Sequence, residues 1–284
     1  MSTIRPARTA LYVLAASASP AALVIRRGPS KWWHFLLWNR DTGMVEPGSW
    51  FHGMVYPADC DISPRGDFFV FLALRGCGAP PAWTAICRPP FVRAVAFWPQ
   101  DCARYGGGYF DERLPVVWLN IPADTITPHL SERLPIEFGY QEERGQFFGS
   151  LTERLRRAGW KPEKKGASGR WVLPSPDRKW ELLLEFPATA GSPQPDPAAP
   201  GHAGGGEYAV RQRGDTAPHA ALAGTEWAGW NSKNLLSLAG EGTLRTARPG
   251  NPQESLTALD LRALQPGSSR QLPRRSPAAR VPHP

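Results

Sequence analysis

Long apolar runs are missing from this chain. A helix that crosses a lipid bilayer needs about 20 consecutive, mostly apolar residues, and no segment of the 284 residues approaches that length. We therefore predict no membrane-spanning helix and no membrane partner. Arg5 and Arg8 precede the apolar residues 9–25, which gives the N-terminal region the outline of a secretory leader. A β-hairpin that turns at residues 17–20 explains the same pattern, and we favour this hairpin and a cytoplasmic protein.

Cysteine is scarce, and its spacing excludes the common metal sites. No C-x-x-C pair is present, and no cysteine stands near a histidine at the spacing of a tetrahedral zinc site. Two disulfides would require an oxidising compartment, so we predict reduced thiols, no metal and no cofactor. The four residues are Cys60, Cys77, Cys87 and Cys102.

Signatures of catalysis are also missing. The segment GSWFHG lacks the G-x-S-x-G of a nucleophile elbow, and YGGGYF has neither the lysine nor the following helix of a phosphate-binding loop. His52 could pair with Asp59 or Asp61 as a base with an orienting carboxylate. We favour structural roles for these three residues, with Asp61 bonding backbone amides of the turn that follows it. The sequence therefore predicts no catalytic residue.

Residues that break helices are abundant, since the chain holds 31 prolines and 28 glycines. Short segments rich in aliphatic, aromatic and β-branched residues alternate with Pro, Gly and Ser, as in LYVLAA, AALVIRR and KWWHFLLWN. This alternation is typical of successive strands. We predict an all-β, mainly antiparallel domain over residues 1–264 that contains one or two short helices.

One helix is expected at about residues 143–158. Phe147, Phe148, Leu151 and Leu155 have the spacing of one helical face, and Gly159 follows where a C-terminal cap belongs. Residues 187–207 contain almost nothing that a core could bury, so we predict a disordered loop there. Residues 265–284, rich in Pro, Ser and Arg, are predicted to form a disordered basic tail.

Three segments place a polar turn directly before an apolar strand: DISPRGDFFVFLAL, LPSPDRKWELLLEF and WAGWNSKNLLSLAG. Proline fixes φ, Ser or Asp bonds the adjacent backbone, and Gly accepts a positive φ, so the chain can reverse and re-enter a sheet. The interval from Ser63 to Ser175 is twice the interval from Ser175 to Asn231. A repeating unit of about 56 residues fits these positions, with an intermediate unit that lacks a clear turn at WLNIPAD.

These three motifs resemble the S-P-D-G turn and following strand of bacterial β-propellers of the WD40-like and TolB-like kind. In such proteins each blade is a four-stranded antiparallel sheet that packs against its neighbours. The resemblance covers the three turns alone, and the chain has no W-D dipeptide. It implies an irregular or incomplete propeller of about five units with a default role as a scaffold. Unrelated hairpins in a β-sandwich or barrel are the alternative.

Charge and aromatic content point to two kinds of binding surface. The net charge is +8, and 12 tryptophans are present. Tryptophan is enriched at protein interfaces, so the candidates for contact with a protein or a sugar are Trp32, Trp33, Trp50, Trp227 and Trp230. A basic cluster could instead contact nucleic-acid phosphates, and its members are Arg154, Arg156, Arg157, Lys161, Lys164 and Lys165.

The function predicted first is that of a non-catalytic scaffold that binds another protein as part of a larger complex. A nucleic-acid-associated accessory protein, using the basic helix and tail, is the second hypothesis. An extracytoplasmic carbohydrate-binding or hydrolytic protein is the third, because of the tryptophans and the leader-like N-terminus. An incomplete propeller also has unpaired edge strands, which another protein could extend.

Overall fold

The structure is a computed structural model of the chain. It describes residues 9–28, 30–75, 80–103, 105–122, 128–141, 151–163, 170–186 and 206–267. Strands dominate these residues and form five sheets, which we number I to V in chain order. The prediction of an all-β, mainly antiparallel fold with a short helix is confirmed, and the hairpin predicted at residues 17–20 joins the first two strands.

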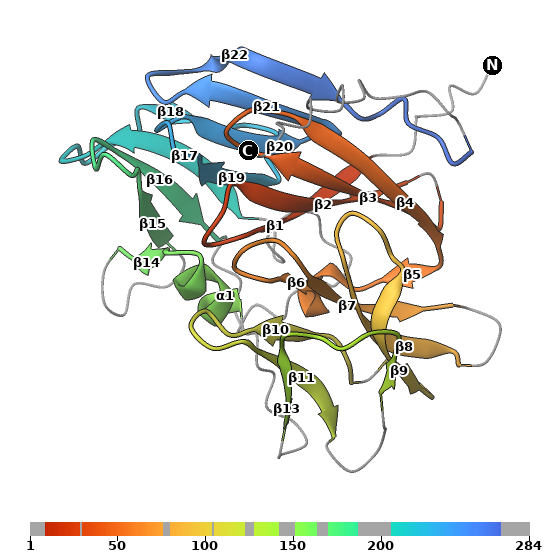
Figure 1. Cartoon of the computed structure of the whole chain (residues 1–284). Helices are drawn as coiled ribbons and strands as arrows, with labels where there is room; N and C mark the ends of the chain where they lie inside the picture. Colours follow the sequence, from red (N-terminus) through yellow and green to blue (C-terminus); the bar gives the residue numbers. More distant parts are fainter. Residues whose placement is uncertain are drawn as a thin grey trace, which may run out of the picture.

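Sheets I and II account for the first part of the chain, as Figure 1 shows in red to yellow. Sheet I runs β1-β2-β3-β4, all antiparallel. Its strands are β1 (Ala10–Ala15), β2 (Ala21–Arg27), β3 (Trp32–Asn39) and β4 (Val45–His52). Sheet II runs β12-β9-β8-β7-β5, with β6 also paired to β7. Its strands are β5 (Met54–Val55), β6 (Asp61–Ile62), β7 (Phe69–Leu74), β8 (Ala82–Cys87), β9 (Ala94–Gln100) and β12 (His129–Leu130), and the 3-10 turn η1 (Pro57–Asp59) precedes β6.

Sheet III departs from chain order, because a strand of sheet II lies between two of its strands in the sequence. Its strands are β10 (Gly108–Phe110), β11 (Val116–Pro122) and β13 (Glu137–Gln141). After β11, β12 pairs with β9 of sheet II, and β13 then pairs parallel to β11. The chain therefore ties the two sheets together through their backbones.

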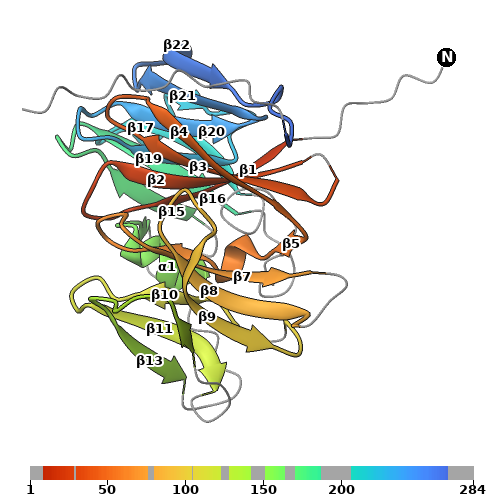
Figure 2. The same cartoon turned by 45° about the vertical axis from the view of Figure 1, so that its right-hand side comes forward.

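Sheets IV and V complete the molecule. Sheet IV contains β14 (Lys161–Pro162), β15 (Arg170–Pro174), β16 (Trp180–Glu185), β17 (Glu207–Gln212) and β18 (Ala220–Ala221). Sheet V contains β19 (Trp227–Trp230), β20 (Leu236–Gly240), β21 (Thr243–Arg248) and β22 (Asn251–Asp260). Both are antiparallel and follow chain order. Figures 1 and 2 show sheet V, in blue, beside the red and orange strands of sheet I, so the two ends of the sheet series meet.

The described part of the helix predicted at residues 143–158 is helical. Helix α1 spans Leu151–Arg157, and residues 142–150 lie outside the described part of the chain. Gly159 has a φ of 85°, as expected for a residue that ends a helix in the left-handed region. Most of the predicted loop at 187–207 and most of the predicted tail also lie outside the described residues.

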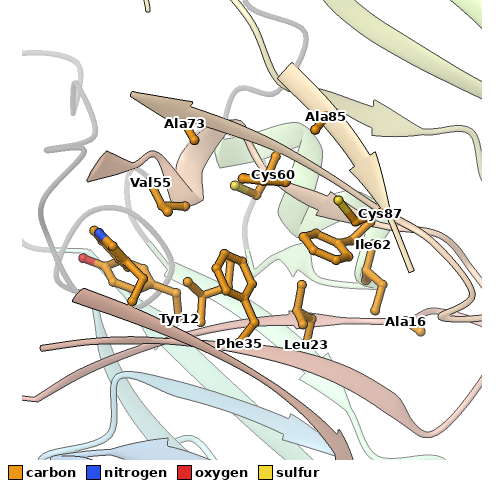
Figure 3. Packing of buried hydrophobic residues seen from close by; sticks show 14 of the residues in the cluster. Tyr12, Ala16, Leu23, Phe35, Val55, Cys60, Ile62, Ala73, Ala85 and Cys87 are labelled. Atoms are coloured by element: carbon orange, nitrogen blue, oxygen red, sulfur yellow. The ribbon is translucent and has the colours of Figure 1, made fainter. Parts of the chain in front are cut away.

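Four hydrophobic clusters join neighbouring sheets. Sheets I and II share the cluster drawn in Figure 3, where Leu23 and Phe35 of sheet I face Ile62 and Cys87 of sheet II. The other three clusters join sheets II and III, sheets IV and V, and sheets V and I. The last of these connects the end of the chain to its beginning, because Leu11 and Val24 pack with Trp227 and Leu244.

One expectation about the architecture needs correction. None of the five sheets closes into a barrel in the described part of the chain, so the barrel alternative is wrong. The segment WLNIPAD has no turn in its described residues, as expected, because these residues belong to β11. The turn of sheet III lies earlier, where the Asp111 amide bonds the Val116 carbonyl at 2.9 Å.

Candidate functional site

A pocket of about 710 Å³ lies between several of the sheets. Strands β1, β6, β15 and β19 and helix α1 all contribute to its lining. Its walls are apolar at Leu14, Leu173 and Trp230, and charged at Arg40 and Arg157. The pocket therefore joins parts of the chain that are far apart in sequence.

In each sheet a turn joins two successive strands near this pocket, and we call the five of them the inner turns; those of sheets I, III, IV and V contribute residues to the pocket lining. In each, the amide of the first residue bonds the carbonyl of the residue that opens the next strand or lies beside it, at 2.8 to 3.0 Å. The pairs are Ala16 with Ala21, Ser63 with Phe68, Asp111 with Val116, Ser175 with Trp180, and Asn231 with Leu235. We call the side of the molecule on which the inner turns lie the turn face.

Three inner turns share a finer geometry, and they are the three that the sequence motifs identify. Ser63 and Ser175 each accept a hydrogen bond at 3.0 Å, through their hydroxyl oxygens, from the amide five residues later. The Asn231 carboxamide accepts one from Leu235 at 2.9 Å. These three polar side chains are buried, so the bonds offset the cost of removing them from water.

The fourth position of each of these three turns lies in the left-handed region. Gly66 has a φ of 83°, Asn234 a φ of 60° and Arg178 a φ of 59°. Glycine adopts this conformation freely and asparagine tolerates it, whereas most other residues lose about 1 kcal/mol. Arg178 is therefore the exception among the three.

Hydrogen bonds connect the inner turns of sheets I and II. The Ala18 amide donates to the Pro64 carbonyl at 2.8 Å, and the Ser19 hydroxyl donates to the Arg65 carbonyl at 2.9 Å. Both bonds use the backbone of the second turn. They fix the relative positions of the two turns beside the pocket.

The inner turns of sheets IV and V are linked in the same way. The Asp177 amide donates to the Asn234 side chain at 2.8 Å. Below the turns, the indole of Trp230 donates to the Leu173 carbonyl at 2.9 Å. Trp230 and Leu173, which make the second bond, line the pocket.

The contact between sheets V and I closes the series. The Arg40 guanidinium donates to the carbonyls of Trp230 and Ala16, each at 3.0 Å. Beside it, both Asp41 carboxylate oxygens accept bonds from Ser232, at 2.9 Å from the amide and 2.7 Å from the hydroxyl. Burial alone would raise the pKa of Asp41, but the bonds from Ser232 and the neighbouring cations lower it.

Arg157 of helix α1 supplies the link to sheet III. Its guanidinium bonds Asp61 at 2.7 Å and the Phe110 carbonyl at 2.9 Å, and it lies 3.4 Å from Glu112. Glu112 also accepts a hydrogen bond from the hydroxyl of Ser17, which connects sheets III and I. The Arg157 side chain is 16% exposed and that of Asp61 is 18% exposed, so this ion pair is largely shielded from water.

The predicted basic cluster is divided by the fold. Arg154 and Arg157 point into the molecule, where Arg154 donates to the Cys60 carbonyl at 2.7 Å. Arg156 and Lys161 are exposed. Lys164 and Lys165 lie outside the described residues. The described members therefore do not form one continuous cationic surface.

The predicted tryptophans are divided as well. Trp33, Trp227 and Trp230 are buried at 2%, 3% and 7% exposure. Trp32 and Trp50 are half-buried and lie edge to face, with ring centroids 6.4 Å apart. The fold therefore places three of the five in its core and leaves two at its edge.

His52 is not brought to either aspartate as a catalytic pair. Its ring packs on Trp32 with centroids 4.8 Å apart, whereas Asp61 bonds Arg157. Asp61 also accepts the amide of Phe110 at 2.8 Å. Asp61 accepts a hydrogen bond from a backbone amide, as predicted. That amide belongs to sheet III and not to the turn that follows Asp61.

Burial shifts the pKa of two thiols and of Asp59. Burial raises the pKa of Cys60 to about 12. Cys87 is also buried and its pKa is raised, while Cys102 is exposed, and all three are free cysteines. Burial raises the pKa of Asp59 to about 6, although the charge of Arg154 opposes this shift.

Two general predictions concern metals and membranes. In the described ranges, no three His, Cys, Asp or Glu side chains gather as metal ligands. The helix in these ranges also lacks the length and apolar character of a membrane span.

Sequence reasoning missed a group of exposed apolar side chains on the turn face. Leu114 is 57% exposed, Phe91 49% and Met44 41%. Leu114 lies in the inner turn of sheet III, and the other two lie in the β8–β9 and β3–β4 connections. Successive connections of an antiparallel sheet alternate between its two ends, so all three lie at the same end of their sheets as the inner turns.

Comparison with known proteins adds no relative. No protein-family model matches the chain, and no curated protein matches it significantly. The function therefore has to be argued from the turn face and the pocket.

Proposed function

We propose that this protein is a non-catalytic interaction module that binds another protein on its turn face. The observation that carries the proposal is the exposure of Leu114, Phe91 and Met44 on the face where the inner turns lie near the pocket. Large apolar side chains are costly to leave in water. Their placement at one end of three different sheets is what an interface needs.

The arrangement of the sheets supports this choice. We propose that the five sheets are the blades of an irregular propeller, with sheet III as the atypical blade. Four interfaces are hydrophobic, and Arg157 bridges to sheet III. A rigid ring of this kind holds its turns in fixed positions, which lowers the entropy lost when a partner binds.

The chemistry of the pocket favours recognition over catalysis. Its charged side chains are engaged within the fold: Asp41 with Ser232, Asp61 with Arg157, and Arg40 with backbone carbonyls. A general base must reach a substrate proton, and these carboxylates already accept bonds from the protein. The Cys60 thiol, with its pKa raised by burial, is a poor nucleophile.

The test is capture of the partner with matched surface variants. The turn-face variant combines Arg65→Glu, Arg113→Glu and Leu114→Ser, which changes three exposed side chains of two inner turns. The control combines Lys31→Glu, Arg75→Glu and Met54→Ser at the opposite end of sheets I and II, with the same change in charge. Tagged proteins are purified from the native host at physiological salt, with and without nuclease, and bound proteins are identified by mass spectrometry.

We expect a stoichiometric protein that survives nuclease, that is retained by the control variant and that falls at least tenfold on the turn-face variant. Equal capture by both variants would place the interface elsewhere. Loss of all partners after nuclease treatment would replace the proposal with the nucleic-acid hypothesis. Circular dichroism of both variants confirms that they fold.

A further inference from the structure

A second hollow, of about 430 Å³, lies on sheet IV and belongs to none of the contacts described above. Residues from β14, β15, β16 and β17 line it, together with Arg178 of the inner turn and Arg213 just after β17. We propose that this hollow binds a compact, multiply charged anion, such as a phosphate-bearing or polycarboxylate small molecule. The site is separate from the proposed protein interface and is tested without any partner.

The floor of the hollow belongs to a network of two arginines and three carboxylates. Arg211, whose side chain is 12% exposed, bonds Glu163 at 2.6 Å and Glu181 at 2.8 Å. Arg170 bonds Glu163 at 3.3 Å and Glu185 at 2.6 Å. Burial alone would raise the pKa of Glu163, but the bonds and charges of Arg211 and Arg170 lower it. All three carboxylates are therefore paired with arginines that the fold already holds in place.

Three further cations at the hollow have no such match. Lys161, Arg178 and Arg213 line it and are exposed. None of them makes an ion pair with a carboxylate in the part of the chain that the structure describes. They come from three separate segments that line one hollow, and the two carboxylates that also line it, Glu163 and Glu181, are already paired with Arg211. An anion with several charges would satisfy all three.

The backbone of Arg178 supports a role for its side chain. The equivalent positions of two sister turns hold Gly66 and Asn234, the residue types that suit a positive φ. An arginine with a φ of 59° is a costly choice at such a position. A strained residue of this kind points to a function for its side chain, and that side chain lines the hollow.

The surrounding charges favour a compact anion over a nucleic-acid strand. Glu185 and Glu207 are exposed cross-strand neighbours on the same face of β16 and β17, farther from the turn. Nucleic-acid binding uses cations that follow a run of phosphates. Here Glu207 and Glu185, the latter paired with Arg170, lie beside the cationic area, so the cations do not continue along the strands and a single compact group fits better than a long polyanion.

The experiment is calorimetric titration of the purified full-length protein in a low-salt buffer without other polyanions. Pyrophosphate and citrate are the probes, and they distinguish a phosphate ligand from a polycarboxylate one. The variants are Arg178→Gly, which removes the guanidinium and suits the backbone, and Arg213→Ala. The control is Arg75→Ala, which removes an exposed arginine from the opposite end of sheet II.

We expect saturable binding of at least one probe, weakened at least tenfold by Arg178→Gly and several-fold by Arg213→Ala, and changed less than twofold by Arg75→Ala. Absence of saturable binding to either probe at millimolar concentration would overturn the proposal. Equal weakening by Arg75→Ala would also overturn it, because the attraction would then be general. So would tighter binding of a 20-nucleotide single strand with a steeper salt dependence, since the hollow would then be part of a nucleic-acid surface.

Discussion

Arg157 shows how far one side chain determines the architecture of this protein. It reaches from helix α1 to a carboxylate of sheet II and a carbonyl of sheet III. A largely buried ion pair of this kind leaves an uncompensated charge when one partner is removed, at a cost of about 3–5 kcal/mol. From the sequence, Arg157 is only a candidate for the alternative nucleic-acid surface, because a local pattern of positive charge does not reveal a partner that lies nearly a hundred positions away.

Asp59 gives a prediction about pH. Its pKa is raised to about 6 in the folded protein, by burial opposed by the charge of Arg154, and the ordinary value is 3.8. The folded state therefore binds more protons than the unfolded state between these values. The stability contributed by protonated Asp59 is fully present below pH 4 and is lost as the pH rises through 6.

Asp59→Asn should remove this dependence, because the amide mimics the protonated acid. We expect the variant to be more stable than the wild type by about 1–3 kcal/mol at pH 7 and almost equal to it at pH 4. Urea denaturation at both pH values measures the difference. Equal effects of the substitution at the two pH values would show that Asp59 titrates normally in the folded protein.

The inner turns show which features of this fold depend on local sequence alone. The motifs at Ser63, Ser175 and Asn231 predict turns correctly, because the bonds that define them join residues at most five positions apart. The turn that begins at Ala16 is predicted as a hairpin, but neither it nor the turn at Asp111 is predicted as an equivalent of these three. Ala16 has no polar side chain to accept a bond, and the turns follow one another at unequal intervals.

The positions of the strands are easier to predict from the sequence than which side of each strand is buried. Trp32 and Trp33 are neighbours, and successive side chains of a strand point to opposite faces. One of them therefore lies at the edge of the molecule and the other in the core. Composition identified the tryptophans, but the faces became clear only once the packing of sheet I between sheets V and II was known.

Arg178 gives a prediction about the stability of its turn. Replacing a strained left-handed residue by glycine should stabilise the protein by about 0.5–1 kcal/mol, even though Arg178→Gly removes a cation that we assign to the anion site. The matched control is Arg65→Gly in the inner turn of sheet II. Arg65 is outside the set of residues with positive φ, so glycine there should cost about 0.5–1 kcal/mol.

Urea denaturation of the two glycine variants checks this prediction. Opposite signs of the change in unfolding free energy support the turn geometry. A loss of stability in both variants would mean that Arg178 is not strained, and would remove one of the two observations behind the anion site.

The five sheets are joined by several kinds of contact. Hydrophobic clusters join four pairs of neighbouring sheets, and Arg40 connects the last sheet to the first. Strand β12, which follows β11 of sheet III in sequence, pairs with β9 and so connects sheets II and III through the backbone. A frame tied in this way holds its turns still, and the exposed apolar side chains on the turn face then have fixed positions for a partner.

Hydrogen exchange with mass spectrometry, comparing the free protein with the captured complex, tests partner binding on the turn face. We predict slower exchange at the inner turns, residues 16–21, 63–68, 111–116, 175–180 and 231–235, with little change in the connections at 28–31 and 75–81. Protection confined to those opposite connections, or to the outer strand β22, would contradict the account. The partner would then bind the other end of the sheets or extend an edge strand, and the turn face would need another explanation.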